Sequence, residues 1–255
     1  MFYVNLKYLK RKVFTVDKIS VIVPCFNEED VLPLFYQEVT KVLESIENTT
    51  YELLFINDGS SDHTEDLIKL MAHKNKQCFY YSFSRNFGKE AAMYAGLENA
   101  TGDYVVIMDA DLQHPPYLLK EMYRSLKEEN YDCSAGKRID RTGEGKLRNF
   151  LSHSFYKVIQ TLTKMDMDDG AGDFRMMTRQ MVDAILELKE YNRYMKGLFS
   201  FVGFNTKWLE FHNVERQGGK TKWSFKSLFS YAFKGIFSFS STPITIAGVI
   251  GGILI

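Results

Sequence analysis

Cysteine, net charge and long uninterrupted apolar runs are all scarce in this sequence of 255 residues. The three cysteines, Cys25, Cys78 and Cys133, are odd in number and far apart, with no CxxC pair, which favours a reducing compartment over a disulfide framework. Lys and Arg together number 32, as do Asp and Glu. The net charge of zero offers no whole-chain attraction to nucleic acid, so we expect no nucleic-acid partner and look for charged partners at local groups.

Two common phosphate-binding signatures are also absent. No GxGxxG follows the first apolar run, which argues against a dinucleotide-binding Rossmann site. The GEGK stretch at 143–146 lacks the upstream glycine and the following Ser or Thr of a P-loop. If the chain binds a nucleotide, it must do so by other means.

The first half of the chain alternates short apolar runs with helical patterns. We predict strands at 19–24, 51–58, 78–83 and 104–109 and helices at 30–46, 62–75, 88–100 and 115–129. This alternation is typical of βαβ units, so the predicted fold is α/β, with a mostly parallel sheet flanked by helices. Pro115 and Pro116 are expected at the start of the fourth helix, and Ser60 or Asp62 at the cap of the second.

Polar side chains follow each of the four predicted strands. Asn27 and Glu28 follow the first, Asp58 ends the second, residues 84–86 follow the third, and residues 109–113 end the fourth. In open α/β sheets, ligands bind beyond the carboxyl ends of the strands, so one ligand can touch all four loops. The alternative is that these are ordinary turn and cap residues on solvated loops.

Asp109, Asp111 and Gln113 stand at alternate positions after the fourth strand. All three offer hard oxygen ligands, which suit Mg²⁺ or Mn²⁺ when a diphosphate supplies further oxygens. A lone DxD is a weak signal, because so short a motif recurs by chance. The preceding strand, the following helix start and the companion loops favour the metal interpretation.

Five ordered motifs make a family resemblance specific: PCFNEED (24–30), NDGSSD (57–62), SRNFGKEAA (84–92), DADLQHPP (109–116) and GDFRMMTR (172–179). Together they resemble the family 2 glycosyltransferases of GT-A, Rossmann-like fold. The resemblance is to the branch that includes dolichyl-phosphate mannose synthase and the bacterial polyprenyl-phosphate glucosyltransferases. It implies inverting transfer of a sugar from a nucleotide-diphosphate sugar to a polyprenyl phosphate at the cytoplasmic face of the cell membrane.

The same resemblance implies a role for each matching residue. The nucleotide-sugar site would comprise Pro24, Asn27, Glu28, Asp58, Lys89, Asp109, Ala110 and Asp111. Asp58 would accept from the base, and Asp109, Asp111 and Gln113 would hold Mg²⁺ or Mn²⁺. The acceptor phosphate would be bound by Arg138, Arg148, Ser152 and Arg175. The catalytic carboxylate would be Asp173.

Several of these assignments have plain alternatives. Lys89 could be a helix-surface lysine, and the basic stretch at 137–148 a solvated hairpin. A phosphate acceptor is largely ionised at pH 7, so Asp173 could orient it rather than remove a proton. His114 receives no role. Arg193 and Lys196 either belong to a family element or lie on a surface helix.

The C-terminal part has a different pattern. Residues 223–242 predict an amphipathic helix in the membrane interface, because aromatic and aliphatic residues recur at helical spacing beside a basic flank. No charge follows Lys234, and residues 243–255 read as the start of a membrane segment of which only 13 residues are present. The expected organisation is thus a basic segment at 1–18, a catalytic domain at 19–222 and these two membrane-associated parts.

Two other functions are considered. One is transfer to a hydroxyl acceptor in cell-wall polysaccharide synthesis, which the missing QxxRW element weakens. The other is an inactive membrane-bound scaffold, against which the intact acidic motifs argue. The sugar and the oligomeric state stay open, a homo-oligomer included, and UDP is favoured over GDP by resemblance.

Overall fold

The computed structural model describes residues 16–139, 171–189, 193–212, 245, 248 and 251–253. The strands in these ranges are β1 (Asp17–Cys25), β2 (Thr49–Asn57), β3 (Cys78–Ser82), β4 (Tyr104–Ile107), β5 (Cys133–Arg138), β6 (Ala171–Thr178) and β7 (Thr206–Phe211). The helices are α1 (Leu32–Glu44), α2 (Thr64–Lys74), α3 (Lys89–Asn99), α4 (Leu118–Glu128), α6 (Arg179–Leu186) and α7 (Met195–Phe201).

The described strands form one sheet in the order β3-β2-β1-β4-β6-β5-β7. The pairs β1–β2, β1–β4, β2–β3 and β5–β7 are parallel, whereas β6 runs antiparallel to both β4 and β5. The sheet is therefore mixed but mostly parallel. In this register Ile107 at the end of β4 lies opposite Arg175, in the middle of β6.

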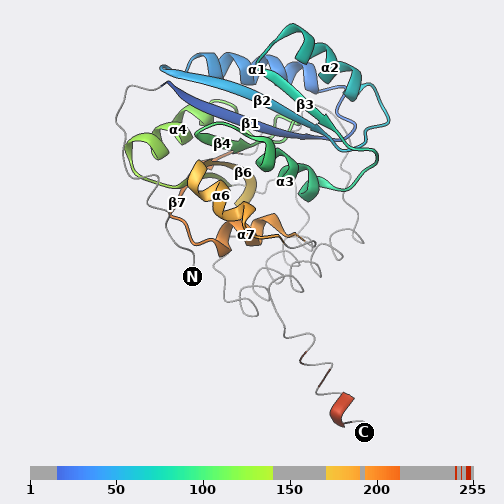
Figure 1. Cartoon of the computed structure of the whole chain (residues 1–255). Helices are drawn as coiled ribbons and strands as arrows, with labels where there is room; N and C mark the ends of the chain where they lie inside the picture. Colours follow the sequence, from blue (N-terminus) through green and yellow to red (C-terminus); the bar gives the residue numbers. More distant parts are fainter. Residues whose placement is uncertain are drawn as a thin grey trace.

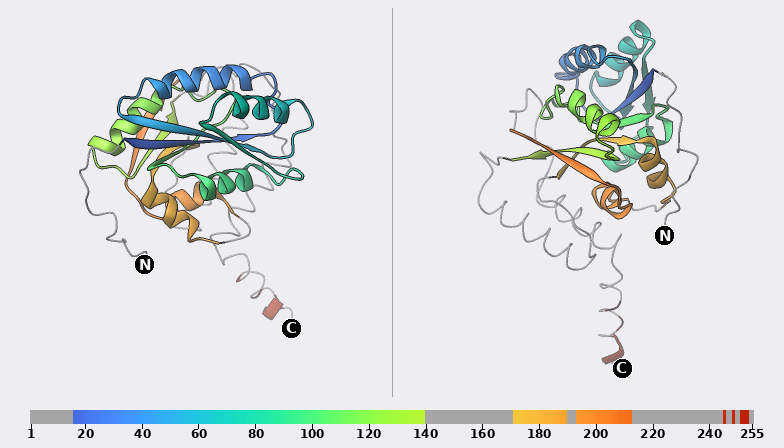
Figure 2. Two further views of the ribbon diagram at one scale, coloured as in Figure 1. Left: turned by 45° about the horizontal axis from the view of Figure 1, so that its top comes forward. Right: turned by 90° about the vertical axis from the view of Figure 1, so that its left-hand side faces the viewer.

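Helices cover both faces of the sheet (Figures 1 and 2). Helices α1, α2 and α4 pack on one face, and α3, α6 and α7 pack on the other. Alternate strand residues serve the two cores: Val21 and Val23 join the first, and Ile22 joins the second. A strand buried on both faces must be apolar at every position, which explains the unbroken apolar runs in the sequence.

The predicted α/β fold is confirmed by this arrangement. Each of the four predicted strands and four predicted helices is present within a few residues of its expected ends. Two details differ. Helix α4 begins at Leu118, so Pro115 and Pro116 lie in the turn before it, where their carbonyl groups accept from the N–H groups of Leu118 and Leu119. The N-cap residue of α2 is His63 rather than Ser60 or Asp62, although Asp62 accepts from the N–H of Thr64, the first residue of α2, at 3.0 Å.

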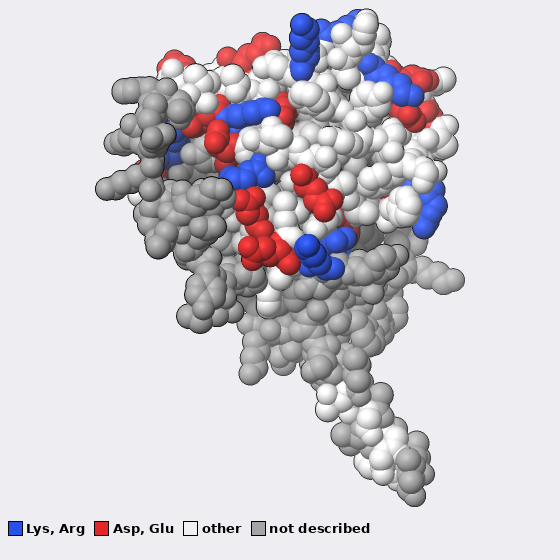
Figure 3. Space-filling view, viewed as in Figure 1, with Lys and Arg blue, Asp and Glu red and all other residues white. Residues whose placement is uncertain are grey.

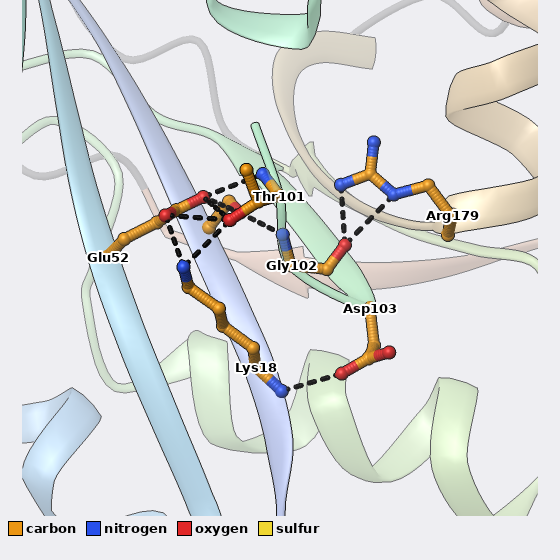
Figure 4. A network of polar contacts seen from close by, with 7 residues as sticks. Lys18, Glu52, Thr101, Gly102, Asp103 and Arg179 are labelled. Carbon is orange, nitrogen blue, oxygen red and sulfur yellow. Dashed lines mark hydrogen bonds and ion pairs between the residues drawn. The ribbon is translucent and has the colours of Figure 1, made fainter. Parts of the chain in front are cut away.

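A network of polar contacts connects the amino ends of β1 and β4 (Figure 4). It lies at the opposite ends of these strands from the predicted site. Glu52 is 3% exposed and accepts from Ser20 Oγ at 2.6 Å, from the N–H of Thr101 at 2.7 Å and from the Lys18 ammonium at 2.5 Å. Arg179 donates to the carbonyl group of Gly102. Burial alone would raise the pKa of Glu52, but its partners, Lys18 foremost, lower it below its usual value.

The predicted amphipathic helix at 223–242 lies outside the described residues, as does most of 243–255. Residues 245, 248 and 251–253 are helical. Within the described ranges, no helix combines the length and apolar character that crossing a bilayer needs. Acidic and basic side chains are interspersed over the described part of the face in Figure 3.

Candidate active site

The first two strand-end loops are held together by side chains of the predicted nucleotide site. The Asn27 side chain accepts from the N–H of Ser61 at 2.8 Å, and the N–H of Asn27 donates to Ser60 Oγ at 3.0 Å. The N–H of Glu28 donates to Thr64 Oγ1 at 2.7 Å. Asn27 has a positive φ of 53°, which asparagine tolerates better than most residues. Pro24, paired in register with Ile56, brings this loop to the carboxyl edge.

Asp58 anchors the third loop. Its carboxylate accepts from the N–H of Phe87 at 2.7 Å and from the N–H of Gly88 at 2.9 Å. Gly88 has φ 98°, a conformation that favours glycine. The side chain is buried, and burial raises the pKa of Asp58 although both backbone donors lower it. Asp58 thus supports the turn before α3, and its contact with a base stays a prediction.

Lys89 is the first residue of α3 and connects two acidic segments. Its Nζ lies 2.7 Å from Oδ1 and 2.8 Å from Oδ2 of Asp109, and 2.7 Å from Oδ2 of Asp173. The side chains are 33%, 25% and 13% exposed, respectively. Lys89 is therefore not a free helix-surface lysine, because it holds the predicted metal loop next to the predicted catalytic carboxylate.

The loop after β4 presents the predicted metal ligands. Asp109 is partly exposed, Ala110 is buried, and Asp111 is 6% exposed, with Oδ1 accepting from the N–H of Gln113 at 3.1 Å. Leu112 between them has φ 56°, which costs about 1–2 kcal/mol for a residue with a Cβ. Strained residues of this kind concentrate at functional loops.

No group of three His, Cys, Asp or Glu residues placed to hold a metal occurs within the described ranges. The loop after β4 supplies two acidic donors, Asp109 and Asp111, and Asp109 shares the Lys89 ammonium with Asp173. Two protein carboxylates still fit Mg²⁺ or Mn²⁺ that takes its remaining oxygens from a nucleotide diphosphate and water. One further atom supports a missing cationic partner: Oδ1 of Asp173 is buried without a hydrogen-bond partner among the described residues.

Asp173 lies near the start of β6 and is kept ionised by cations. Burial alone would raise the pKa of this carboxyl, but Lys89, Lys196 and Arg175 outweigh that effect and hold its pKa well below the usual range. The same pair of carboxylates, led by Asp109, raises the pKa of Lys89 despite its burial. The site thus contains an ammonium group paired with two carboxylates.

His114, for which the sequence predicts no function, packs against β6. Its ring stacks on Phe174 with centroids 4.9 Å apart, and meets Phe211 edge-on at 6.0 Å. It is 8% exposed, and this burial lowers its pKa. His114 therefore joins the metal loop to the residue that follows Asp173.

Helix α7 and the segment before it turn out to belong to the site region. The Arg193 guanidinium lies 3.5 Å above the Tyr94 ring of α3, and the N–H of Met195 donates to Glu90 at 2.8 Å. Lys196 also lowers the pKa of Asp173. The sequence left Arg193 and Lys196 undecided, because helical spacing does not show which face meets a neighbour; in the structure, Arg193 and the N–H of Met195 contact α3.

The predicted acceptor residues fall into two groups. Arg138 ends β5, and Arg175 is 4% exposed, with its guanidinium donating to the Gly172 carbonyl at 2.9 Å and lying 3.8 Å above the Phe199 ring. Arg175 therefore supports the start of β6 in this structure, and phosphate binding by it stays a prediction. Arg148 and Ser152 lie outside the described residues.

A mostly parallel sheet flanked by helices, with two acidic segments joined by a lysine at its carboxyl edge, has the architecture of a GT-A-like α/β fold. The family profile described as glycosyl transferase family 2 matches residues 20–186. The chain belongs to this family and is a glycosyltransferase of the hexosyltransferase type.

Relatives of known sequence agree with this membership. The chain is 46% identical over 226 residues to the putative glycosyltransferase CsbB of Bacillus subtilis, covering 89% of this chain and 68% of that protein. It is 39% identical over 238 residues to the prophage bactoprenol glucosyl transferase homolog of Escherichia coli, covering 92% and 76%. It is 38% identical over 234 residues to the bactoprenol glucosyl transferase of Shigella phage SfX, covering 92% and 76%.

Solved structures share the fold. The mannosyltransferase PcManGT of Pyrobaculum calidifontis, in complex with GDP-Man and Mn²⁺, has a TM-score of 0.56 at 18% identity, covering 80% of this chain. The chain spans only 58% of that protein. Glucosyl-3-phosphoglycerate synthase of Mycobacterium tuberculosis, in complex with Mn²⁺, UDP-glucose and phosphoglyceric acid, has a TM-score of 0.55 at 18% identity, covering 89% and 83%. These likenesses establish the GT-A-like fold of the chain.

Proposed function

We propose that this glycosyltransferase transfers a sugar, with inversion, from a nucleotide-diphosphate sugar to a polyprenyl phosphate at the cytoplasmic face of the cell membrane. The observation that carries the proposal is the Asp109–Lys89–Asp173 contact. One ammonium group joins Asp109, the carboxylate predicted to face the donor, to Asp173, the predicted catalytic carboxylate. The bactoprenol glucosyl transferases, similar over most of this chain, support the lipid acceptor. Their names also favour glucose, and we favour UDP as its carrier.

The donor would lie along the carboxyl edge of the sheet. Asn27, Glu28 and Asp58 stand on loops already fixed to one another, so the nucleoside would meet a preformed surface. Such preorganisation lowers the entropy lost on binding. The diphosphate would then reach the loop of Asp109 and Asp111.

Asp109, Asp111 and Gln113 would hold Mg²⁺ or Mn²⁺ together with the donor diphosphate. The bound cation would offset negative charge on the leaving nucleotide, which is the chemistry that a hard divalent ion supplies in phosphate sites. Two observations support this assignment: Oδ1 of Asp173 has no hydrogen-bond partner among the described residues, and the Asp109 side chain is 25% exposed.

Asp173 would orient the acceptor rather than remove a proton from it. A phosphate monoester is largely ionised near pH 7 and is already a nucleophile, so it needs no general base. The Lys89 ammonium holds Oδ2 of Asp173 at 2.7 Å, which fixes the direction of the carboxylate. Arg138 at the end of β5, with Arg148 and Ser152 beyond the described ranges, would bind the acceptor phosphate.

The experiment is to incubate membranes carrying the full chain with a panel of radiolabelled nucleotide sugars and polyprenyl phosphate, and then to extract and identify the lipid. We expect label from UDP-glucose in a polyprenyl-phosphate sugar, dependent on Mg²⁺ or Mn²⁺ and lost in Asp111→Ala. Label that appears only in polymer or in a hydroxyl acceptor would overturn the proposal. The absence of any labelled product from every donor would do the same.

A further inference from the structure

The Lys89 ammonium is shared between two carboxylates. It donates to Oδ2 of Asp109 at 2.8 Å and to Oδ2 of Asp173 at 2.7 Å, and Oδ1 of Asp109 lies 2.7 Å from the same Nζ. The ammonium therefore lies against both oxygens of the Asp109 carboxylate. If Lys89 serves the nucleotide sugar, as the sequence predicts, it starts from this position between the two carboxylates.

Asp109 is the partner that ligand binding would take from Lys89. The two oxygens that lie within 2.8 Å of the ammonium are the ones that Asp109 would offer to a divalent cation. An ammonium and a divalent cation on one carboxylate repel each other strongly in a partly buried site. The Asp173 carboxylate is 13% exposed against 25% for Asp109, so withdrawing the ammonium from Asp173 costs more.

The local structure lets the side chain of Lys89 move while its backbone stays fixed. The Asp58 carboxylate holds the N–H of Gly88 at 2.9 Å, and the carbonyl group of Gly88 accepts from Ala91 and Ala92 in the first turn of α3. The Lys89 side chain is one-third exposed, so it has space on its solvent side. Rotation about side-chain torsions alone would carry the ammonium from Asp109 towards solvent or a phosphate.

We infer that the Lys89 ammonium is an internal counter-cation, which occupies the place of the divalent cation at Asp109. When the metal binds, the ammonium moves from Asp109 to the donor phosphate, and throughout this change the ammonium stays paired with Asp173. The inference rests on the proposed metal-dependent transfer and makes Lys89 a positioning residue before the donor binds. It couples the two ligands, because the site releases Lys89 for the phosphate only when the metal has entered.

This arrangement predicts an unusual effect of removing the lysine. If the ammonium occupies Asp109 about nine-tenths of the time, it lowers the apparent affinity of the site for Mn²⁺ about tenfold. Removing the ammonium should therefore raise that affinity by the same factor. We therefore expect Lys89→Met to bind Mn²⁺ about tenfold more tightly in the absence of nucleotide, and yet to lose turnover. A lysine that only supports the fold or only binds the donor would leave Mn²⁺ affinity unchanged or weaken it.

The measurement is a Mn²⁺ titration of the purified full chain without nucleotide, following free Mn²⁺ by electron paramagnetic resonance. Lys89→Arg keeps the positive charge and should bind Mn²⁺ like the wild type. Lys69→Met is the matched control, because Lys69 pairs with Glu65 on the exposed side of α2 at 2.8 Å. Asp109→Asn should abolish Mn²⁺ binding, so that the signal of free Mn²⁺ stays at its protein-free height, and this assigns the binding to this site.

The outcomes separate this inference from the proposed function. Unchanged or weaker Mn²⁺ binding in Lys89→Met, with Mn²⁺ binding still lost in Asp109→Asn, would overturn the counter-cation role and leave the metal site standing. Mn²⁺ binding that Asp109→Asn does not alter would overturn the metal site itself, and the inference with it. Tighter Mn²⁺ binding in Lys89→Met together with slower turnover supports both.

Discussion

A carboxylate at the end of a strand can bind a ligand or support a neighbouring loop, and replacing Asp58 distinguishes these two roles. Its sequence position predicts contact with a nucleoside, and the structure shows it holding the turn before α3. Replacing Asp58 with Ala removes the acceptor of two backbone donors, the N–H groups of Phe87 and Gly88. A buried donor left without a partner costs about 1–3 kcal/mol. Because this loop is only partly buried, we expect a loss of about 2–4 kcal/mol for the pair.

The loss should also reach catalysis, because Lys89 follows Gly88 directly. A loosened turn lets the ammonium leave Asp109 and Asp173, so turnover should fall even at saturating donor. Misplacement by about 1 Å costs on the order of a hundredfold in rate. The assay is urea unfolding of the purified chain, followed by steady-state kinetics with varied nucleotide sugar.

Asp66→Ala is a suitable control for this experiment. Asp66 lies on α2, its side chain is 75% exposed, and the change should stay within about 0.5 kcal/mol of wild-type stability. Asp58→Ala with wild-type stability and turnover, and only a higher KM for the donor, would refute the anchoring role. Asp58 would then contact the nucleoside and contribute little to the loop.

Three further changes test other parts of the molecule. Asp173→Asn should lower turnover about a hundredfold while sparing donor binding; near-native activity, measured by lipid labelling, would remove it from the reaction. Arg138→Ala should raise the KM for polyprenyl phosphate about tenfold and leave that for the nucleotide sugar unchanged, since a charged hydrogen bond is lost; equal effects on both would assign the arginine to the donor or the fold. Glu52→Gln should lower the free energy of unfolding at pH 7 by about 1–3 kcal/mol. Because its partners lower the pKa of Glu52 from its usual 4.5, its contribution is present above that pH and lost as the pH falls through the folded value, so wild type and variant should converge in acid; a pH-independent difference would contradict this.

Local pattern was enough to predict the first half of the fold. Runs such as Val21–Val23 are apolar at every position, and in a chain of this composition that pattern predicts strands covered on both faces. Helix α1 shows its buried stripe directly, with Leu32, Phe35, Val39 and Leu43 at helical spacing. The strand-end loops then followed from the rule that parallel strands meet at one edge.

The later strands could not be placed in this way. Strand β6 enters between β4 and β5 and runs antiparallel to both, although more than 60 residues separate it from β4 in sequence. Pairing of that kind depends on long-range contacts, and the alternation of Phe174 and Met176 with Arg175 fixes only which side chains share a face. Sequence spacing therefore gave no distance between Asp109 and Asp173.

The sequence by itself determined which chemical groups the protein has and the strand ends that deliver them, because residue type and periodicity are local properties. Only the tertiary structure decided how they meet. It placed Lys89 between Asp109 and Asp173, turned Asp58 towards the backbone of the next loop, and brought Arg193 against Tyr94 of α3. The reason is physical: an ion pair requires atoms within a few ångströms of each other, and packing of the sheet with α3 and α7 sets those distances.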